Sequence, residues 1–487
     1  MIHYIFAFFI GFIFFDYLKK EIVNYQCKKL KGPSILPIIG NLYTIKDDTH
    51  KVLLKYHETY GPVYRVWMGD YFTIVINDLD LIKKVFVENY YNFLNHSDIP
   101  SIENISHNFN GLPFNLDKNE WKRRRIIIAG ALSKIKLKNV YSAMTNINSQ
   151  FLKTIKEFSD TKEPFEPHYY SDKLIVDINF KLFFNIDGGY DTTLDTFKKL
   201  ADSFNNLVLE LGTAKLSDYC FILQPFLRKY YHWFNKDRDY IDSFLKREFD
   251  LHFESFKPEY IENPRDLMDT MIGKIGENLD RPSLKKEVVE MLFNIFIGAI
   301  DTSAGIINWS FIYLANYQEI QEEVYLELKK IACDRPIELA DRISTPFLNA
   351  FIKEVERIRP VIPLSVPRIG SEDIVIDGIK FPKNCQVIPN LYGIAFSEKY
   401  WDNPNEFNPS RFFTKSASSV NYSIFSYGPR ACVGQRFAHD MLYLNIGNII
   451  KSFKFSSFDG KPVDDTGVLG LSLKPKHCKL SVQERND

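Results

Sequence analysis

"FSYGPRACVGQR", residues 425–436, is the stretch of this 487-residue chain that decides its fold. Gly428 and Gly434 flank Cys432 and permit tight turns and close backbone approach. An apolar helical run begins just after Gly434, which predicts that Cys432 lies at a helix N-terminus. Because the free N–H groups of such a terminus favour anions, we expect a lowered thiol pKa and a thiolate.

A thiolate of this kind is a suitable soft ligand for haem iron. Arg430 can pair with a haem propionate through charge-assisted hydrogen bonds. Taken singly, these residues are better explained as a buried free cysteine and an ordinary loop arginine. The joint pattern F-x-x-G-x-R-x-C-x-G, which begins at Phe425, is far more specific than its parts. We therefore interpret residues 425–436 as a haem-binding loop.

This loop resembles the haem-binding signature of the cytochrome P-450 family. "KEVERIRP" (353–360) resembles the family's E-x-x-R helix, and "FNPSRF" (407–412) resembles its F-x-P-E-R-F segment. The resemblance implies a structural ion network of Glu354, Arg357 and Arg411 that holds the Cys432 loop. Glu354 and Arg357 share a helix face, although a surface pair has the same spacing. Ser410 stands where the family usually has Glu.

"FNIFIGAIDTSAG" (293–305) resembles the family's oxygen-activating helix. The resemblance implies catalytic roles for Asp301 and Thr302 in delivering protons to bound O2. The Thr302 hydroxyl is four residues after Gly298, so it can bond to that carbonyl and locally open the helix. Ala299 stands where the family usually has Gly. An ordinary core helix is the alternative, but an Asp in so apolar a run argues against it.

Further resemblances concern the haem propionates. "NEWKRRR" (119–125) resembles the family's W-x-x-x-R element, which implies that Trp121 and Arg125 contact a propionate. "VIPLSVPR" (361–368) ends at Arg368, which would bind a propionate as well. For 119–125 a solvated basic helix face is an equally good explanation. Lys122, Arg123 and Arg124 offer positive charge on which an acidic electron donor could dock.

The substrate pocket is expected to include parts of residues 91–115 together with a mostly apolar or small set: Asn294, Gly298, Ala299, Ile362 and Val366. Such walls fit a hydrophobic small molecule. Size and regiochemistry of the substrate do not follow from them.

The N-terminus predicts a membrane anchor. Residues 2–15 are almost wholly apolar and Lys19-Lys20 follow, so we expect residues 1–20 to be an uncleaved single-pass anchor with the body on the cytoplasmic side. A signal-peptide core is the alternative, but no basic n-region or A-x-A-like site is present. Residues 28–42 contain prolines and glycines and predict a hinge, which leaves 43–487 as the catalytic domain.

Hydrophobic periodicity predicts a mainly α chain with a small β subdomain. A hairpin is expected over 62–78 and short strands over 361–400. Helices are expected over 79–90, 117–132, 138–160, 172–211, 224–251, 283–315, 316–332, 345–358 and 435–453. No linker divides the chain, so we expect one large haem-binding domain of the P-450 fold.

Composition excludes several classes of protein. Lys+Arg and Asp+Glu both number 61, so net charge gives no argument for nucleic acid as a partner. The six cysteines form no C-x-x-C, which argues against zinc-ribbon and thioredoxin-type sites and suggests a reducing compartment. Asn95 and Asn104 begin N-x-S triplets, and we expect both to stay unglycosylated in the cytoplasm.

The function implied by the resemblance is monooxygenation by a haem b with an axial thiolate. Because no flavin or nicotinamide motif is present, electrons would come from a separate NADPH-dependent cytochrome P-450 reductase, with cytochrome b5 as a further candidate donor. O2, a hydrophobic substrate and lipid of the endoplasmic reticulum membrane are the other expected partners. Three alternatives stay open: a haem-thiolate isomerase or dehydratase, a non-catalytic haem-binding protein, and a membrane-anchored interaction protein without cofactor.

Overall fold

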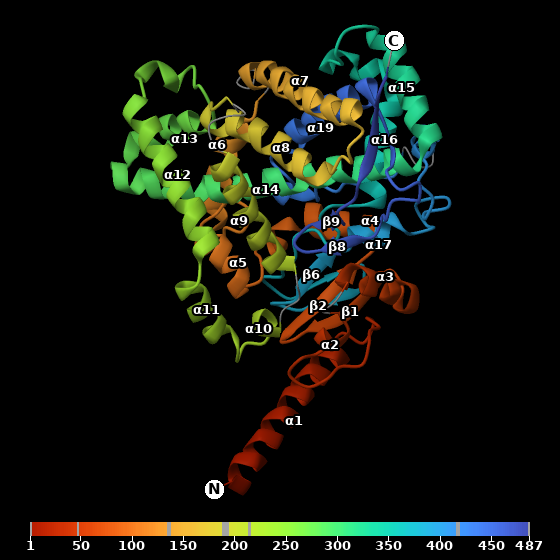
Figure 1. The fold of residues 1–487 in the computed structure, drawn as a ribbon. Coiled ribbons are helices and arrows are strands. Elements are labelled where there is room, and N and C mark those ends of the chain that lie inside the picture. Colours follow the sequence, from red (N-terminus) through yellow and green to blue (C-terminus); the bar gives the residue numbers. More distant parts are fainter. Residues whose placement is uncertain are drawn as a thin grey trace.

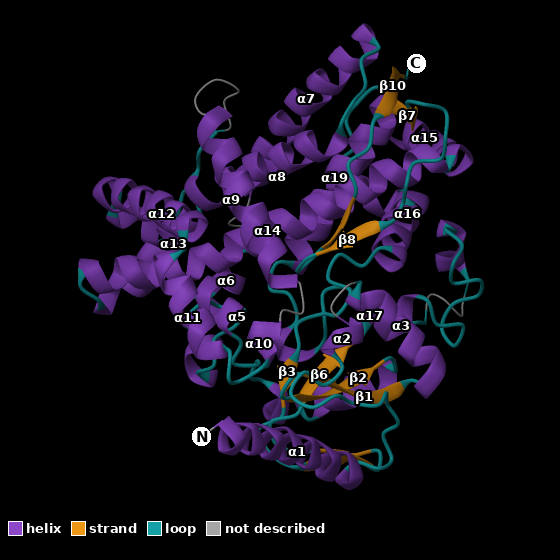
Figure 2. Ribbon diagram, turned by 60° about the horizontal axis from the view of Figure 1, so that its bottom comes forward, coloured by secondary structure: helices purple, strands orange, loops and turns teal. Residues whose placement is uncertain are grey.

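The computed structural model describes residues 2–45, 48–133, 138–187, 194–212, 216–414 and 419–485. Within them the chain is mainly helical, with a small β region beside the N-terminal helix (Figures 1 and 2). The helices before residue 256 are α1 (Ile2–Gln26), α2 (Leu42–Ile45), α3 (Thr49–Tyr60), α4 (Leu79–Lys83), α5 (Pro100–Ile105), α6 (Lys118–Ala131), α7 (Lys138–Thr161), α8 (Pro167–Phe184), α9 (Leu194–Gly212), α10 (Leu216–Tyr219), α11 (Gln224–Trp233) and α12 (Lys236–Ser255). Those after it are α13 (Leu267–Ile275), α14 (Arg281–Asn316), α15 (Gln318–Ala332), α16 (Pro346–Ile358), α17 (Leu391–Ala395) and α19 (Gln435–Ser452).

The strands form one four-stranded sheet and three two-stranded ribbons. The sheet has the order β1-β2-β6-β3, where β2 and β6 are parallel and the outer pairs are antiparallel. The ribbons pair β4 with β5, β7 with β10 and β8 with β9. The strands are β1 (Val63–Met68), β2 (Tyr71–Ile76), β3 (Arg368–Ile369), β4 (Ile374–Ile376), β5 (Ile379–Phe381), β6 (Gln386–Pro389), β7 (Phe453–Ser457), β8 (Gly467–Leu469), β9 (Leu473–Pro475) and β10 (Leu480–Glu484).

Helix α14 is the central element of the helical part. It runs through the body and packs against α8 and α12 (Figure 1). Asp280 caps its first turn by accepting the N–H of Ser283 at 3.1 Å. Helix α14 is long and apolar enough to cross a membrane, but 78% of its apolar window is buried inside the protein. It is therefore a core helix of the protein, and it contains the sequence 293–305.

The predicted mainly α fold with a small β part is confirmed, as is the hairpin, but some helix boundaries were wrong. The stretch 224–251 is two helices, because the Asn235 amide bonds to the Tyr231 carbonyl and ends α11. The stretch 172–211 is also interrupted: α8 ends at Asn185, which is in the left-handed conformation. Residues 188–193 of that prediction lie outside the described residues. The predicted helix 79–90 is α4 followed by a π-helical turn, Lys84–Glu88. The β-rich region 361–400 also contains α17.

Candidate active site around Cys432

The Cys432 loop is held by close backbone contacts. Gly428 has φ of 72°, and a Cβ atom on it would lie 1.8 Å from the carbonyl oxygen of Phe86. Only glycine fits both the conformation and the space. The N–H of Cys432 donates to the Phe425 carbonyl at 2.9 Å. Helix α19 begins at Gln435, so Cys432 lies just before its N-terminus, as the sequence predicted.

The predicted lowering of the Cys432 pKa is wrong for the thiol in this structure. Desolvation raises its pKa, and this outweighs the lowering by backbone hydrogen bonds from Gly434 and Gln435 and by the charge of Arg125. The hydrogen bonds at the helix N-terminus thus lower the pKa of Cys432, but by less than desolvation raises it. A bound metal deprotonates a coordinating thiol outright, so the full negative charge needs the iron as partner.

Three arginines gather near Cys432 without carboxylate partners. In the described part of the chain, Arg125, Arg368 and Arg430 form no ion pair. Burial lowers the pKa of Arg368 to about 9, and the charge of Arg125 adds to this. Burial likewise lowers the pKa of Arg430 to about 9, with contributions from Arg368 and Arg125. Arg430 stacks over the indole of Trp121, 4.4 Å from its centroid.

Buried cations that repel one another are unfavourable unless an anion joins them. Two propionate groups are such anions, so these residues fit haem. The open space beside Gly298 also fits, because a Cβ atom there would meet nothing within 4 Å. Cys432 would ligate the iron, while Arg125, Arg368, Arg430 and Trp121 would hold the propionates.

His96 belongs to this cluster, and the sequence reasoning missed it. Its Nε2 atom accepts from the guanidinium of Arg368 at 3.1 Å, and its Nδ1 atom donates to the Pro367 carbonyl at 2.9 Å. Burial lowers the pKa of His96 well below its usual range, and Arg368 and Arg430 add to this effect. The imidazole is therefore neutral and can accept from Arg368. A single histidine more than 270 residues away in sequence carries no local signal of this contact.

The predicted basic docking face is corrected by the structure. Arg124 is buried, and Glu120 and Glu287 lie 3.7 and 3.6 Å from its Nε atom. Arg123 pairs with the same two carboxylates. Two of the three charges next to Arg125 are therefore neutralised within the protein, and only Lys122 remains exposed without an ion pair among the described residues.

Glu354, Arg357 and Arg411 are brought together in a buried cluster. Arg357 donates to both oxygens of Glu354, at 2.7 and 2.8 Å. Arg411 donates to Glu354 at 3.0 Å. The remaining guanidinium protons go to backbone carbonyls of 395 and 402–406. Ser410 is exposed, and its departure from the family pattern leaves this cluster complete.

Across the site, α14 presents Thr302 and Asp301. The Thr302 hydroxyl donates to the Gly298 carbonyl at 2.7 Å. The helix remains regular across this turn, so the predicted local opening is wrong for this structure. Asp301 is 7% exposed and forms an ion pair with Lys474 of β9.

A second carboxylate, also missed from sequence, lies near this pair. Lys474 donates to the Asn205 side chain at 2.7 Å. Burial raises the pKa of Asp172 to about 6, with Lys474 lowering it and Asp301 raising it. Asp301 of α14 therefore has Lys474 of β9 as a cationic partner and Asp172 of α8 as a neighbouring carboxyl group.

An apolar cavity of about 100 Å³ lies between the four-stranded sheet and the loops around it. Its lining includes Met68, Ile102, Phe114, Tyr219, Val366 and Leu471. Ile102 and Phe114 fall in the predicted range 91–115, and Val366 was predicted individually.

The other predicted pocket residues do not line this cavity. Ile362 and Ala299 pack against the core. The Asn294 amide donates to the carbonyl of Ile105 at 3.2 Å, and Gly111 approaches it so closely that a Cβ there would lie 2.3 Å away. Asn294 thus fastens the loop after α5 to α14.

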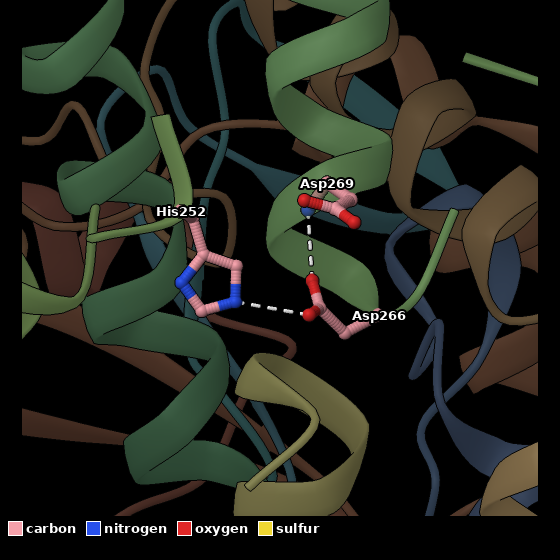
Figure 3. A group of neighbouring side chains, drawn as sticks. All are labelled: His252, Asp266 and Asp269. Atoms are coloured by element: carbon pink, nitrogen blue, oxygen red, sulfur yellow. Dashed lines mark hydrogen bonds and ion pairs between the residues drawn. The ribbon is translucent and has the colours of Figure 1, made fainter. Parts of the chain in front are cut away.

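A group of possible metal ligands, His252, Asp266 and Asp269, joins α12 to the start of α13 (Figure 3). Asp266 caps α13 by accepting the N–H of Asp269 at 2.8 Å, and its other oxygen meets His252 Nε2 at 3.0 Å. Arg265 donates to both oxygens of Asp269, at 2.6 and 2.8 Å. These contacts account for the group as a helix cap with ion pairs.

Comparison with known proteins shows the family and the fold. The family model "Cytochrome P450" matches residues 30–482. "Probable cytochrome P450 508A4" of Dictyostelium discoideum is 37% identical over 94% of both chains, and "Probable cytochrome P450 508D1" of the same organism is 33% identical over 99% of both. A zebrafish cytochrome P450 solved with abiraterone superposes with a TM-score of 0.77 at 22% identity, covering 90% of this chain and all of that one, which shows the shared fold.

Proposed function

Since this chain belongs to the cytochrome P450 family and so is in general terms a haem-thiolate monooxygenase, we propose that it oxygenates a small hydrophobic substrate with O2 and two electrons from a separate reductase. The observation that carries the proposal is the grouping of Arg125, Arg368 and Arg430 near Cys432 without carboxylate partners among the described residues. When bound, haem supplies the activation of O2 and the transfer of one oxygen atom to the substrate.

The chain's own side chains would bind the haem, hold its loop and supply protons. Cys432 would ligate the iron, and the buried Glu354–Arg357–Arg411 cluster would keep its loop in place. Thr302 would hold its hydroxyl at the turn of α14 that contains Gly298, and the adjacent residue Asp301 would supply the proton. Lys474 orients Asp301. The apolar cavity favours a hydrophobic substrate.

The alternative functions would leave some of these residues without a role. A haem-thiolate isomerase or dehydratase rearranges peroxides and needs no proton relay, so the Asp301–Thr302 pair would have no task. The same pair would be idle in a non-catalytic haem-binding protein. The Cys432 loop makes an interaction protein without cofactor the weakest choice.

The cellular setting is part of the proposal. The chain has no flavin or nicotinamide motif of its own, which supports an NADPH-dependent reductase as electron donor, with cytochrome b5 as a second donor. The side chains Tyr4, Phe6, Phe8, Phe14 and Phe15 of α1 are exposed, which supports anchoring in a bilayer, with the endoplasmic reticulum as the expected membrane. Asn104 is buried and bonded to Asn235 and Arg238, which fits an unglycosylated site.

The direct test is spectroscopic. Reduced wild-type protein with CO should show the strongly red-shifted Soret band of thiolate ligation, and Cys432→Ala should lose it. Cys478→Ala is the matched control, because this half-buried thiol lies outside the site. Reductase-dependent NADPH and O2 consumption then separates a monooxygenase from an isomerase or a carrier. A normal CO spectrum in Cys432→Ala would refute the ligand assignment.

A further inference from the structure

The last turns of α1 are fastened to the catalytic body by buried polar groups. Lys20 is 1% exposed, and its ammonium lies 2.9 Å from Asp16 and donates to the Ile38 carbonyl at 3.0 Å. Asn24 accepts from the indole N–H of Trp67 at 2.9 Å. Because lysine is almost never fully buried unless it is paired, the burial of Lys20 depends on these partners. Lys20, which the sequence predicts to flank the anchor, is thus also held by contacts with the body.

Ile38, in the predicted hinge, is held in a strained conformation. Its φ is 63°, which is a genuine outlier for a β-branched residue. Its N–H donates to Asp16 at 2.6 Å and its carbonyl accepts from Lys20, so both backbone groups are bound by α1. Such strain persists only where the surroundings enforce it. The anchor therefore does not pivot freely at this point.

The same lysine connects α1 to the β1–β2 turn and to the cavity. Asp70 lies 3.8 Å from Lys20. It accepts the N–H of Phe221 at 2.7 Å, and its own N–H donates to the Tyr219 carbonyl at 2.9 Å. A Cβ on Gly69 would lie 2.3 Å from that carbonyl, so the turn and the segment after α10 are in close contact. Tyr219 lines the cavity. We call Asp16, Lys20, Ile38 and Asp70 the anchor clasp.

The segment beyond Tyr219 is apolar and exposed. Phe221, Ile222 and Phe226 are 49%, 60% and 71% exposed. Helix α1 leaves the body at the end where β1, β2 and α10 lie (Figures 1 and 2). Because the exposed aromatic residues of α1 leave the body at that end, a lipid bilayer is the partner that would cover both surfaces.

We propose that Lys20 is a positioning residue: through the anchor clasp it holds the membrane anchor at a fixed angle to the body, so that residues 221–226, beside the cavity wall, rest in the bilayer. This rests on the proposed membrane attachment and adds to it a rigid coupling between anchor and cavity. The anchor is then a part of the catalytic body and not a flexible tether.

The test compares two adjacent lysines in the full-length holoprotein. Lys20→Gln removes the buried cation of the clasp, whereas Lys19→Gln removes an adjacent exposed cation, so both variants lose one positive charge. The probe is tryptophan fluorescence in phosphatidylcholine vesicles with and without brominated acyl chains. Trp233 is the exposed tryptophan, at 72%, and the other four are buried. A Phe226→Trp, Trp233→Phe background places the exposed indole at the segment of interest.

In this background, Lys19→Gln should keep the quenching by brominated lipid, and Lys20→Gln should lose most of it while still sedimenting with vesicles and showing the normal CO spectrum. Equal quenching in both variants would overturn the inference. If Lys20→Gln lacks haem, Asp70→Asn takes its place as the test. The amide oxygen introduced by this substitution can still accept the N–H of Phe221, but the negative charge that faces Lys20 is removed. Asp70→Asn should lose the quenching, and unchanged quenching in this variant would overturn the role of the clasp. If the parent protein does not sediment with vesicles, the proposed membrane attachment itself fails.

Discussion

Arg357→Ala should destabilise the protein far more than removal of an exposed cation with the same spacing. Arg357 is 0% exposed and donates to both oxygens of Glu354 and to backbone carbonyls at 395, 404 and 406. Truncation leaves Glu354 with Arg411 and the N–H of Asn408, and it removes the Arg357 donors from the buried carbonyls of 395 and 404. Removing one partner of a buried pair costs about 3–5 kcal/mol. The unfolded fraction should therefore rise at least about 10²-fold.

Lys51→Ala is the matched control. Lys51 pairs with Asp48 at 3.0 Å, also with three residues' spacing, but the two side chains are 46% and 50% exposed. Exposed pairs contribute about 0.2–1 kcal/mol. Urea unfolding of both variants, followed by loss of the CO-bound Soret band, measures the difference, and haem content after purification supports it. Equal midpoints for the two variants would refute the claim that the Glu354 cluster stabilises the loop around Cys432.

Three further outcomes follow from the site. Thr302→Val should lower product formed per NADPH and raise hydrogen peroxide, since proton transfer by a positioned group contributes about 10²–10⁴-fold; Ser310→Ala, which removes the same kind of bond to Ile306 on α14, should not. Lys474→Met should also lower this ratio because Asp301 loses its cation, whereas Lys476→Met, which only breaks an exposed pair, should leave it unchanged. Burial raises the pKa of Glu356 from 4.5 to about 8, so its contribution to stability is present below pH 4.5 and is lost as pH rises through about 8. Glu356→Gln should therefore flatten the loss of unfolding free energy over this range, by up to about 1.4 kcal/mol per pH unit; an unchanged slope would mean that the carboxyl ionises at its ordinary pKa.

Sequence predicts best those parts of the site whose residues are close together in the chain. Glu354 and Arg357 lie within one helical turn, and Thr302 reaches Gly298 in the same way. The loop 425–436 contains its own turn glycines. Such contacts depend on local geometry, which spacing alone describes.

Contacts between distant segments were not predicted, for a physical reason. His96 meets Arg368, and Lys474 meets Asp301, only because β3 and β9 are brought to the site by the fold. The run 122–125 reads as a basic face because the sequence does not reveal Glu287 of α14 beside it. The contacts of Lys20 with the Ile38 carbonyl and with Asp70 were missed for the same reason, because only the fold brings these segments to α1.

The electrostatics of the site explain why its parts depend on haem together. Burial makes the positive charges of Arg368 and Arg430 costly, and it also makes a thiolate at Cys432 costly. Arg125 lowers the pKa of Cys432 but raises the cost of charge at Arg368. The protein's own groups therefore do not stabilise both the positive charges of the arginines and a negative charge on Cys432. Two propionates and one iron ion would neutralise both at once, and the binding free energy of haem would then also stabilise the folded loop. We therefore expect loss of haem to destabilise the Cys432 loop and the arginines around it together.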